Sequence, residues 1–280
     1  MHLFSTIAEV RNFSEKVKVS GKSIGFVPTM GALHDGHIEL VKKAKAENVV
    51  VICSIFVNPT QFDNAEDLKK YPRTLEADCE LLRSANCDAV FAPSAEEMYE
   101  EMPRLAFDFG NLETVMEGKF RKGHFNGVGI VVGKLFNIVS PHKAYFGKKD
   151  LQQVAVVKRL VKDLNFGLEI IPCETIRETD GLAMSSRNRR LSTQGREQAF
   201  NVYLSLKIAQ EALKMGSTVV HAKAEVERHF KNLPQFAIEY FEIVDFETFE
   251  PITLFNPDRQ TAICTANYLE GVRLIDNIVF

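Results

Sequence analysis

The sequence predicts an α/β protein with a Rossmann-like, doubly wound parallel sheet and a smaller C-terminal α+β domain. Two observations lead to this expectation. Strand-like and helix-like segments alternate up to about residue 175, which is typical of a parallel sheet covered by helices. Beyond that point two helical segments precede three strand-like segments, which favours a separate small domain. We therefore expect one domain at residues 1–176 and a second at residues 177–280.

The stretch at residues 23–57 carries the pattern most clearly. Residues 23–27 are expected to form a short strand that Pro28 stops, and a helix at about 36–47 follows a polar loop. The run at 49–57 is apolar and rich in β-branched residues, as in a parallel strand buried on both faces. Strand, loop, helix and strand together predict a βαβ unit.

The other elements follow from the same periodicities. In the first domain, helices are expected at residues 5–18, 75–84, 128–139 and 151–164, and strands at 89–92, 144–146 and 168–171. The segment 128–139 is apolar on nearly all sides and should be a buried helix. In the second domain, helices are expected at 191–215 and 219–233, and strands at 238–245, 261–268 and 272–278.

Composition excludes several classes of protein. The chain has 280 residues, a net charge of −3 and a pI of about 6.2, so it lacks the basic excess of a general nucleic-acid binder. Its five cysteines include no C-x-x-C pair, which fits free thiols in a reducing compartment. No signal peptide is recognisable, and no apolar run reaches the roughly 20 residues that cross a bilayer. We expect a cytoplasmic protein with no membrane partner, and Cys53 in its core.

The loop after the first predicted strand, FVPTMGALHDGH at residues 26–37, is the most informative segment. Ligands of such folds bind where strands end, and Gly31 and Gly36 allow positive φ and close approach of the backbone. His34 and His37 are spaced to face the same spot at the start of a helix, whose N-terminus favours a phosphate. The alternative is an ordinary loop with two surface histidines. No third ligand with zinc spacing stands nearby.

Further candidate segments follow other predicted strands or the domain boundary. The sequence MSSR at 184–187 offers hydroxyls and an arginine to phosphate oxygens, and GKKD at 147–150 offers a lysine and a carboxylate that suits Mg²⁺. Gln61 in NPTQF can donate to and accept from a polar substrate, and Gln153 faces the same region by its position. Arg121 precedes the predicted buried helix. Taken alone, MSSR is as compatible with a solvated basic turn as with a phosphate site. For GKKD and the Arg121 segment an ordinary polar loop is favoured, and for NPTQF a turn formed by Asn-Pro is the alternative. The residues by themselves therefore predict a nucleotide-binding α/β domain without naming a substrate.

Together these segments resemble one family. His34 to His37 resemble the HxGH motif of the nucleotidylyltransferase and class I aminoacyl-tRNA synthetase superfamily, and residues 184–187 resemble its KMSKS-like element. The strings FVPTMGALHDGH, FVNPTQF, YPRT, GHFNGV, FGKKDLQQ and DGLAMSSRN, in this order, are similar to the pantothenate synthetase family. The resemblance spans nearly the whole chain, although the final 80 or so residues contribute little to it.

The resemblance implies a reaction and a site. ATP and pantoate would give pantoyl adenylate and pyrophosphate, and β-alanine would then give pantothenate and AMP, with Mg²⁺ placed by Asp150. His37 would donate a proton, while His34, Lys149 and Arg187 would contact phosphate. The implied ATP contacts are Met30, Gly31, Ala32, Leu33, His34, Asp35, Gly36, His37, Gly147, Lys148, Lys149, Asp150, Ile176, Met184, Ser185, Ser186 and Arg187. The implied pantoate and β-alanine contacts are Pro28, Thr29, Asn58, Gln61, Arg121 and Gln153. A homodimer through the N-terminal domain is also implied.

Two departures and three alternatives accompany this interpretation. Glu39 and Lys148 replace residues common in the family, and the added charge at Lys148 is expected to affect ATP affinity at most. The alternatives are another nucleotidyl-transferring enzyme, a tRNA-charging enzyme and a non-catalytic nucleotide sensor. The identity of the product distinguishes the first alternative from a ligase. The near-neutral charge of the chain and its length, which leaves no anticodon-binding extension, argue against the second. The intact histidines, Lys149 and Arg187 argue against the third. Residues 60–75 or the C-terminal domain are expected to act as a lid.

Overall fold

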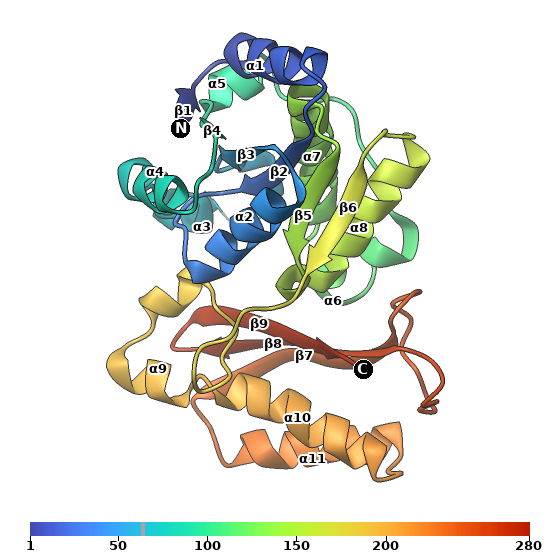
Figure 1. The fold of residues 1–280 in the computed structure, drawn as a ribbon. Coiled ribbons are helices and arrows are strands. Elements are labelled where there is room, and N and C mark those ends of the chain that lie inside the picture. The colour runs from blue at the N-terminus through green and yellow to red at the C-terminus, as the bar shows by residue number, and fades with distance from the viewer. Residues whose placement is uncertain (63–64) are drawn as a thin grey trace. The chain divides into compact units, whose positions relative to one another are not determined.

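The computed structural model describes residues 1–62 and 65–280, which divide into two compact units (Figure 1). The first unit comprises Met1–Glu113, Gly118–Lys148 and Gln152–Glu174. The second comprises Thr114–Glu117, Lys149–Leu151 and Thr175–Phe280, so it includes two short segments from within the N-terminal part of the chain. Positions 63 and 64 of the expected lid loop lie outside the described residues.

The first unit is built on a parallel sheet with the order β1-β4-β3-β2-β5-β6. Its strands are β1 (His2–Phe4), β2 (Ile24–Thr29), β3 (Val50–Ile55), β4 (Ala89–Phe91), β5 (Lys143–Gly147) and β6 (Glu169–Cys173). The order of addition reverses between β2 and β5, and ligands of open α/β sheets bind beyond the carboxyl ends of the strands at such a point. The predicted doubly wound sheet is confirmed.

Helices cover both faces of this sheet because apolar residues on its strands point alternately to either side. Phe26 and Ile52 pack in one core with α1, α7 and α8, whereas Val27 and Val51 pack in another with α2 and α4. The helices up to β6 are α1 (Ile7–Val19), α2 (Asp35–Glu47), α3 (Ala65–Lys70), α4 (Leu75–Ser84), α5 (Ala95–Met98), α6 (Met116–Phe120), α7 (His124–Val139) and α8 (Leu151–Asp163).

Two details of the strands differ from prediction. The expectation that Pro28 stops the strand is wrong, because β2 runs to Thr29 and Pro28 lies in register with Ser54 of β3. The ladder between β2 and β5 ends at Phe26, so the missing N–H of Pro28 costs no hydrogen bond on that side. Strand β1 has three residues, which is too short for a periodic signal, and it was not predicted.

Helix α7 is buried on nearly all sides, as predicted, although it begins at His124 rather than Val128. The five cysteines are free and buried, which confirms the expected core position of Cys53. Burial raises the pKa of each thiol, that of Cys87 to about 12. The thiols therefore remain protonated at neutral pH and pack as small apolar groups.

The second unit contains helices and an antiparallel sheet with the order β7-β8-β9 (Figure 1). Its longer elements are α9 (Thr193–Gln198), α10 (Asn201–Lys214), α11 (Val219–Lys231), β7 (Phe236–Asp245), β8 (Thr261–Leu269) and β9 (Val272–Val279). The single long helix expected at 191–215 is wrong. The Ala199 N–H donates to Arg196 O and the Val202 N–H to Ala199 O, so the chain tightens into short turns that separate α9 from α10.

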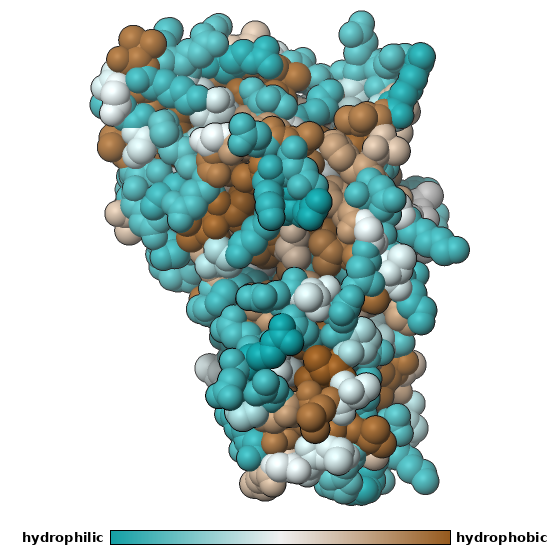
Figure 2. Space-filling view, turned by 90° about the vertical axis from the view of Figure 1, so that its right-hand side faces the viewer, coloured by the Kyte–Doolittle hydropathy of each residue, from teal (hydrophilic) through white to brown (hydrophobic). Residues whose placement is uncertain are grey.

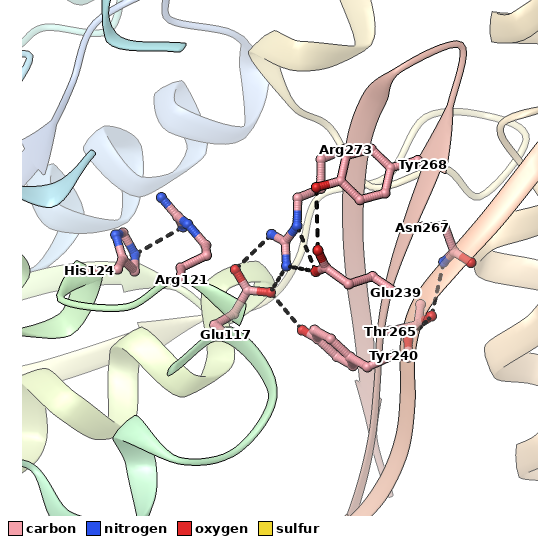
Figure 3. A network of polar contacts seen from close by, with 9 residues as sticks. All are labelled: Glu117, Arg121, His124, Glu239, Tyr240, Thr265, Asn267, Tyr268 and Arg273. Carbon is pink, nitrogen blue, oxygen red and sulfur yellow. Dashed lines mark hydrogen bonds and ion pairs between the residues drawn. The ribbon is translucent and has the colours of Figure 1, made fainter. Parts of the chain in front are cut away.

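Segment 114–117 belongs to the second unit because of an ionic cluster around Glu117 (Figure 3). The Arg273 guanidinium on β9 donates to both carboxylate oxygens of Glu117, at 2.9 and 2.7 Å, and to Glu239 on β7 at 2.9 Å. The Tyr240 hydroxyl donates to Glu117 at 2.8 Å. These side chains are mostly buried, so each charge depends on the others for its partners.

A second cluster, around Glu47 at the end of α2, leads to a prediction about pH. Glu47 accepts hydrogen bonds from Lys43, Lys143 and Tyr145 at 2.9 to 3.0 Å, and these bonds lower its pKa from 4.5 to about 2. Because the pKa is lower in the folded state, the cluster stabilises the fold above the unfolded pKa of Glu and loses this effect as pH falls toward 2. We expect Glu47→Gln to lower the free energy of unfolding by roughly 1 kcal/mol at neutral pH.

Urea titrations across the acid range measure this effect. The difference between Glu47→Gln and the wild type should shrink as pH falls below about 4. Glu39→Gln serves as the matched control, since Glu39 lies on the same helix and pairs with Lys42 at an exposed position. A loss of stability that is the same at all pH values would contradict the assigned role of Glu47.

The surface shows hydrophilic residues interspersed with hydrophobic ones on the face drawn in Figure 2. Large exposed apolar side chains such as Val19, Met215 and Leu254 come from separate elements, which is usual for globular proteins. Among the described residues, no helix combines the length and apolar character that crossing a bilayer requires.

Candidate active site

The loop between β2 and α2 places His34 and His37 side by side. His34 is the N-cap of α2 and His37 is one turn further, with their ring centroids 4.1 Å apart. The backbone N–H of His34 donates a long hydrogen bond of 3.4 Å to Nδ1 of His37. Since Nδ1 accepts, the proton of the neutral ring lies on Nε2. The positive end of α2 further favours an anion here.

The backbone before His34 is held by a buried carboxylate that the sequence analysis missed. Gly31 and Ala32 have positive φ values of 84° and 51°, a conformation in which successive N–H groups surround an anion. Asp78 on α4 fills this position and accepts from Ala32 N at 3.0 Å and Leu33 N at 2.8 Å. These two N–H groups are therefore used inside the protein. Gly36 lies in the first turn of α2, so the positive φ expected there was wrong.

Gln61 lies in the short 3-10 turn Pro59–Gln61 that follows β3. Its side chain is largely buried, with Nε2 2.9 Å from the sulfur of Met30 and Oε1 accepting from Asn58 at 3.1 Å. Asn58 is more deeply buried and also contacts Tyr99 at 2.8 Å and the carbonyl of Gly127 at 3.2 Å. Asn58 thus uses both ends of its amide to hold the turn, and Gln61 is oriented by it.

Arg121 reaches the same turn through His124. His124 Nδ1 lies 2.8 Å from the Gln61 carbonyl, which can only accept, so this nitrogen carries the proton. His124 Nε2 then accepts from Arg121 at 3.0 Å (Figure 3). Gly127 permits this packing, because a Cβ there would lie 2.2 Å from the carbonyl oxygen of Thr60. The structure thereby joins three predicted residues, Arg121, Gln61 and Met30, into one connected group of the first unit.

In the second unit, Lys149, Ser185 and Arg187 line one pocket. Ser185 caps the 3-10 turn Ser186–Arg190 and accepts from Arg187 N at 3.3 Å. Asn188 in the same turn is buried and donates to Ala183 O at 3.1 Å, which holds the turn against its own hairpin. The phosphate-binding candidates from GKKD and MSSR are therefore brought together, as the resemblance implies.

The remaining predicted residues lie in regular elements or in turns held by hydrogen bonds. Thr29 donates to Ser54 O at 2.7 Å and accepts from Gly31 N, while Met184 N donates to Ile176 O at 3.0 Å. Gln153 on α8 is half-buried, whereas its neighbour Gln152 is buried and donates to Leu112 O. Gly147 ends β5, Lys148 pairs with Glu174, and Pro28, Asp35 and Ser186 belong to β2, α2 and the 3-10 turn respectively.

Asp150 is the candidate for placing Mg²⁺. Its carboxylate is about half exposed and lies 3.7 Å from the Lys149 ammonium. Groups of three or more metal-binding side chains were not found among residues 1–62 and 65–280. Mg²⁺ commonly takes one or two carboxylates and completes its shell with water and phosphate oxygens. A single half-exposed carboxylate beside the Lys149 ammonium fits this mode of binding.

Comparison with known proteins agrees with this geometry. The family model described as pantoate-beta-alanine ligase matches residues 2–279. The pantothenate synthetase of Cytophaga hutchinsonii is 49% identical over 98% of both chains, and that of Phocaeicola vulgatus is 50% identical over 100% of this chain and 99% of its own.

Solved structures give the same result. A pantothenate synthetase from Thermus thermophilus has a TM-score of 0.92 at 42% identity, over 99% of both chains. The pantoate-beta-alanine ligase from Francisella tularensis, complexed with beta-gamma ATP and beta-alanine, has a TM-score of 0.82 at 37% identity, over 100% of this chain and 97% of its own. The chain belongs to the pantoate–β-alanine ligase family.

Proposed function

We propose that this protein condenses (R)-pantoate with β-alanine in an ATP-dependent reaction that passes through a pantoyl-adenylate intermediate. The observation that carries the proposal is the pair of adjacent imidazoles, His34 and His37, at the N-terminus of α2. Such a pair suits charge that develops on an α-phosphate. The family, and the beta-gamma ATP and beta-alanine in the Francisella tularensis ligase complex, support the choice of substrates.

In the first step, a pantoate carboxylate oxygen attacks the α-phosphorus of ATP, and the bond to pyrophosphate breaks. Two anions must approach each other, so cationic and donor groups have to offset their repulsion. Nε2–H of His37 donates toward the α-phosphate, and His34, Lys149 and Arg187 bind phosphate oxygens. Asp150 would hold Mg²⁺, which supplies charge neutralisation on the phosphates when it is bound.

In the second step, the neutral amine of β-alanine attacks the acyl carbon of the adenylate, AMP leaves and the amine loses a proton. AMP is a good leaving group, so holding the amine close to the adenylate is sufficient to drive the reaction. Gln61 contacts pantoate and β-alanine, and Gln153 contacts pantoate. Asn58 and Arg121 support Gln61 through the contacts of the 3-10 turn. No covalent enzyme intermediate is required.

Three further properties belong to the proposal. The protein acts in the cytoplasm as a homodimer that forms through its N-terminal domain, and the C-terminal domain serves as a lid that protects the adenylate from water. Hydrogen exchange tests the lid. Protection in residues 175–280 should rise when ATP and pantoate are added, and unchanged exchange there would argue against it.

The experiment that tests the function is AMP release by the purified protein with ATP, Mg²⁺, pantoate and β-alanine, omitting each in turn. AMP and pantothenate should form in equal amounts, and only when every component is present. Pyrophosphate release together with a stable nucleotidyl product would identify a nucleotidyltransferase instead. Absence of both AMP and pantothenate would show that the substrates have been assigned wrongly.

A further inference from the structure

Lys149 is attached to the antiparallel sheet of the second unit through the side chain of Asn277. The Nδ2 group of Asn277, on β9, donates to the backbone carbonyl of Lys149 at 2.8 Å. Asn277 is buried, so this bond is shielded from competing water. Residues 149–151 belong to the second unit, although the chain on either side of them belongs to the first. The bond from Asn277 gives a physical reason for this assignment.

Asn277 is itself held firmly at both of its backbone groups. Its N–H donates to Asp276 Oδ1 at 2.7 Å, and its carbonyl accepts from Arg177 at 3.0 Å. The same Arg177 guanidinium binds both oxygens of Asp276, at 2.6 and 3.0 Å, and the Asp276 side chain is almost completely buried. A planar guanidinium bound to both carboxylate oxygens leaves little freedom of rotation.

Arg177 also fixes the hairpin that leads to the MSSR segment. It donates to Gly181 O at 3.0 Å and stacks over the Tyr203 ring at 4.0 Å. Arg177 forms an antiparallel bridge with Ala183, directly before Met184. Asp276 and Asn277 are neighbours on β9. Through Arg177 and through Lys149 O, they are linked to the two segments that contribute Arg187 and Lys149 to the pocket.

We propose that Asn277 is a positioning residue, which fixes the backbone of Lys149 so that its ammonium meets a phosphate of ATP at the same pocket as Arg187. The inference rests on the proposed function only in that Lys149 binds ATP. The Lys149 ammonium is carried on a flexible four-carbon stem. Its position is therefore well defined only if the Lys149 backbone is fixed. Asn277 acts through Lys149 and does not itself touch the nucleotide.

A double-mutant cycle tests this inference, with the dissociation constant of Mg·ATP measured by calorimetry. Lys149→Ala should weaken binding by roughly 10- to 100-fold, as expected for loss of a charge-assisted hydrogen bond. Asn277→Ala should weaken it by roughly tenfold. In the Lys149→Ala background, Asn277→Ala should have no further effect, because the group that it positions is gone.

Asn267→Ala is the matched control. Asn267 is buried in β8 of the same sheet and donates to Thr265 at 2.9 Å (Figure 3), and neither of these two residues lines the pocket. It should match Asn277→Ala in its effect on Tm while leaving ATP affinity unchanged. If Asn277→Ala does not fold, Asn277→Asp, which keeps the size and removes the donor, takes its place in the cycle.

The outcomes are decisive in either direction. Additive effects of the two substitutions, or unchanged ATP affinity in the Asn277 variant, would overturn the positioning role. An equal loss of ATP affinity in Asn267→Ala would show that Asn277→Ala weakens binding only by destabilising the sheet, which would also overturn the positioning role. ATP binding does not require pantothenate to form, so a wild-type protein that binds ATP without making pantothenate would refute the proposed function and leave this inference standing.

Discussion

Replacement of His37 by alanine is expected to reduce kcat by about 10²- to 10⁴-fold, the range that a positioned proton donor contributes. His37 Nε2 carries the proton because Nδ1 accepts from the His34 backbone. Without the His37 imidazole, the charge that develops on the α-phosphate during the attack of pantoate lacks this donor. The effect should appear in the first step, measured as pantoate-dependent pyrophosphate release. The KM for ATP should change much less than kcat, since in the proposed site Lys149 and Arg187 remain to bind the phosphates.

His221→Ala provides a matched control for this experiment. His221 occupies the same third position of its helix, α11, where its backbone N–H donates to the capping Thr218, and its side chain is exposed. It should retain wild-type rates. A His37→Ala protein that is folded and releases pyrophosphate within tenfold of the wild-type rate would show that His37 does not act as the donor.

Replacement of Asp78 by alanine is expected to destabilise the first unit by roughly 2 to 6 kcal/mol. Two buried backbone N–H groups, those of Ala32 and Leu33, lose their acceptor, and each unsatisfied group costs roughly 1–3 kcal/mol. Ala32, a non-glycine residue with a φ of 51°, also loses the hydrogen bond that holds its backbone in the positive φ region. The loop that carries His34 should then become mobile, and activity should fall with stability.

Urea denaturation and amide exchange measure this second effect. Exchange at Ala32 and Leu33 should accelerate more than exchange in the β3 core. Asp78→Asn, which keeps one acceptor oxygen, should fall between the wild type and Asp78→Ala. Asp163→Ala, which removes an exposed carboxylate paired with Arg159 on α8, should cost less than about 0.5 kcal/mol. Unchanged exchange at Ala32 and Leu33 would contradict the role given to Asp78.

The sequence predicted what periodicity and local spacing encode. Residues 49–57 are apolar except for Ser54, because β3 is covered on both faces. Residues 34–37 form the N-cap and first turn of α2, so the closeness of His34 and His37 follows from the local geometry of a helix start. The alternation of strands and helices predicted the doubly wound sheet for the same reason. These features depend on residues that are neighbours along the chain.

The missed features depend on partners that are distant in sequence. Asp78 lies 45 and 46 residues from the amides that it binds, and Asn277 lies 128 residues from Lys149. The available signal was weak: Asp78 occupies a buried position of α4 one turn before Leu82, where a charged residue requires a partner. The break between α9 and α10 was hidden because apolar residues continue the helical spacing across it.

The ionic cluster around Glu117 has a consequence for chimeras made from related enzymes. Glu117 and Arg273 are 156 residues apart, yet they form a pair with two hydrogen bonds in one unit. In a chimera with a crossover at about residue 175, Glu117 and Arg273 would come from different parent proteins. Recombination should therefore succeed more often when segments 114–117 and 149–151 are exchanged together with residues 175–280, and sequence drift at Glu117 should be coupled to drift at Arg273.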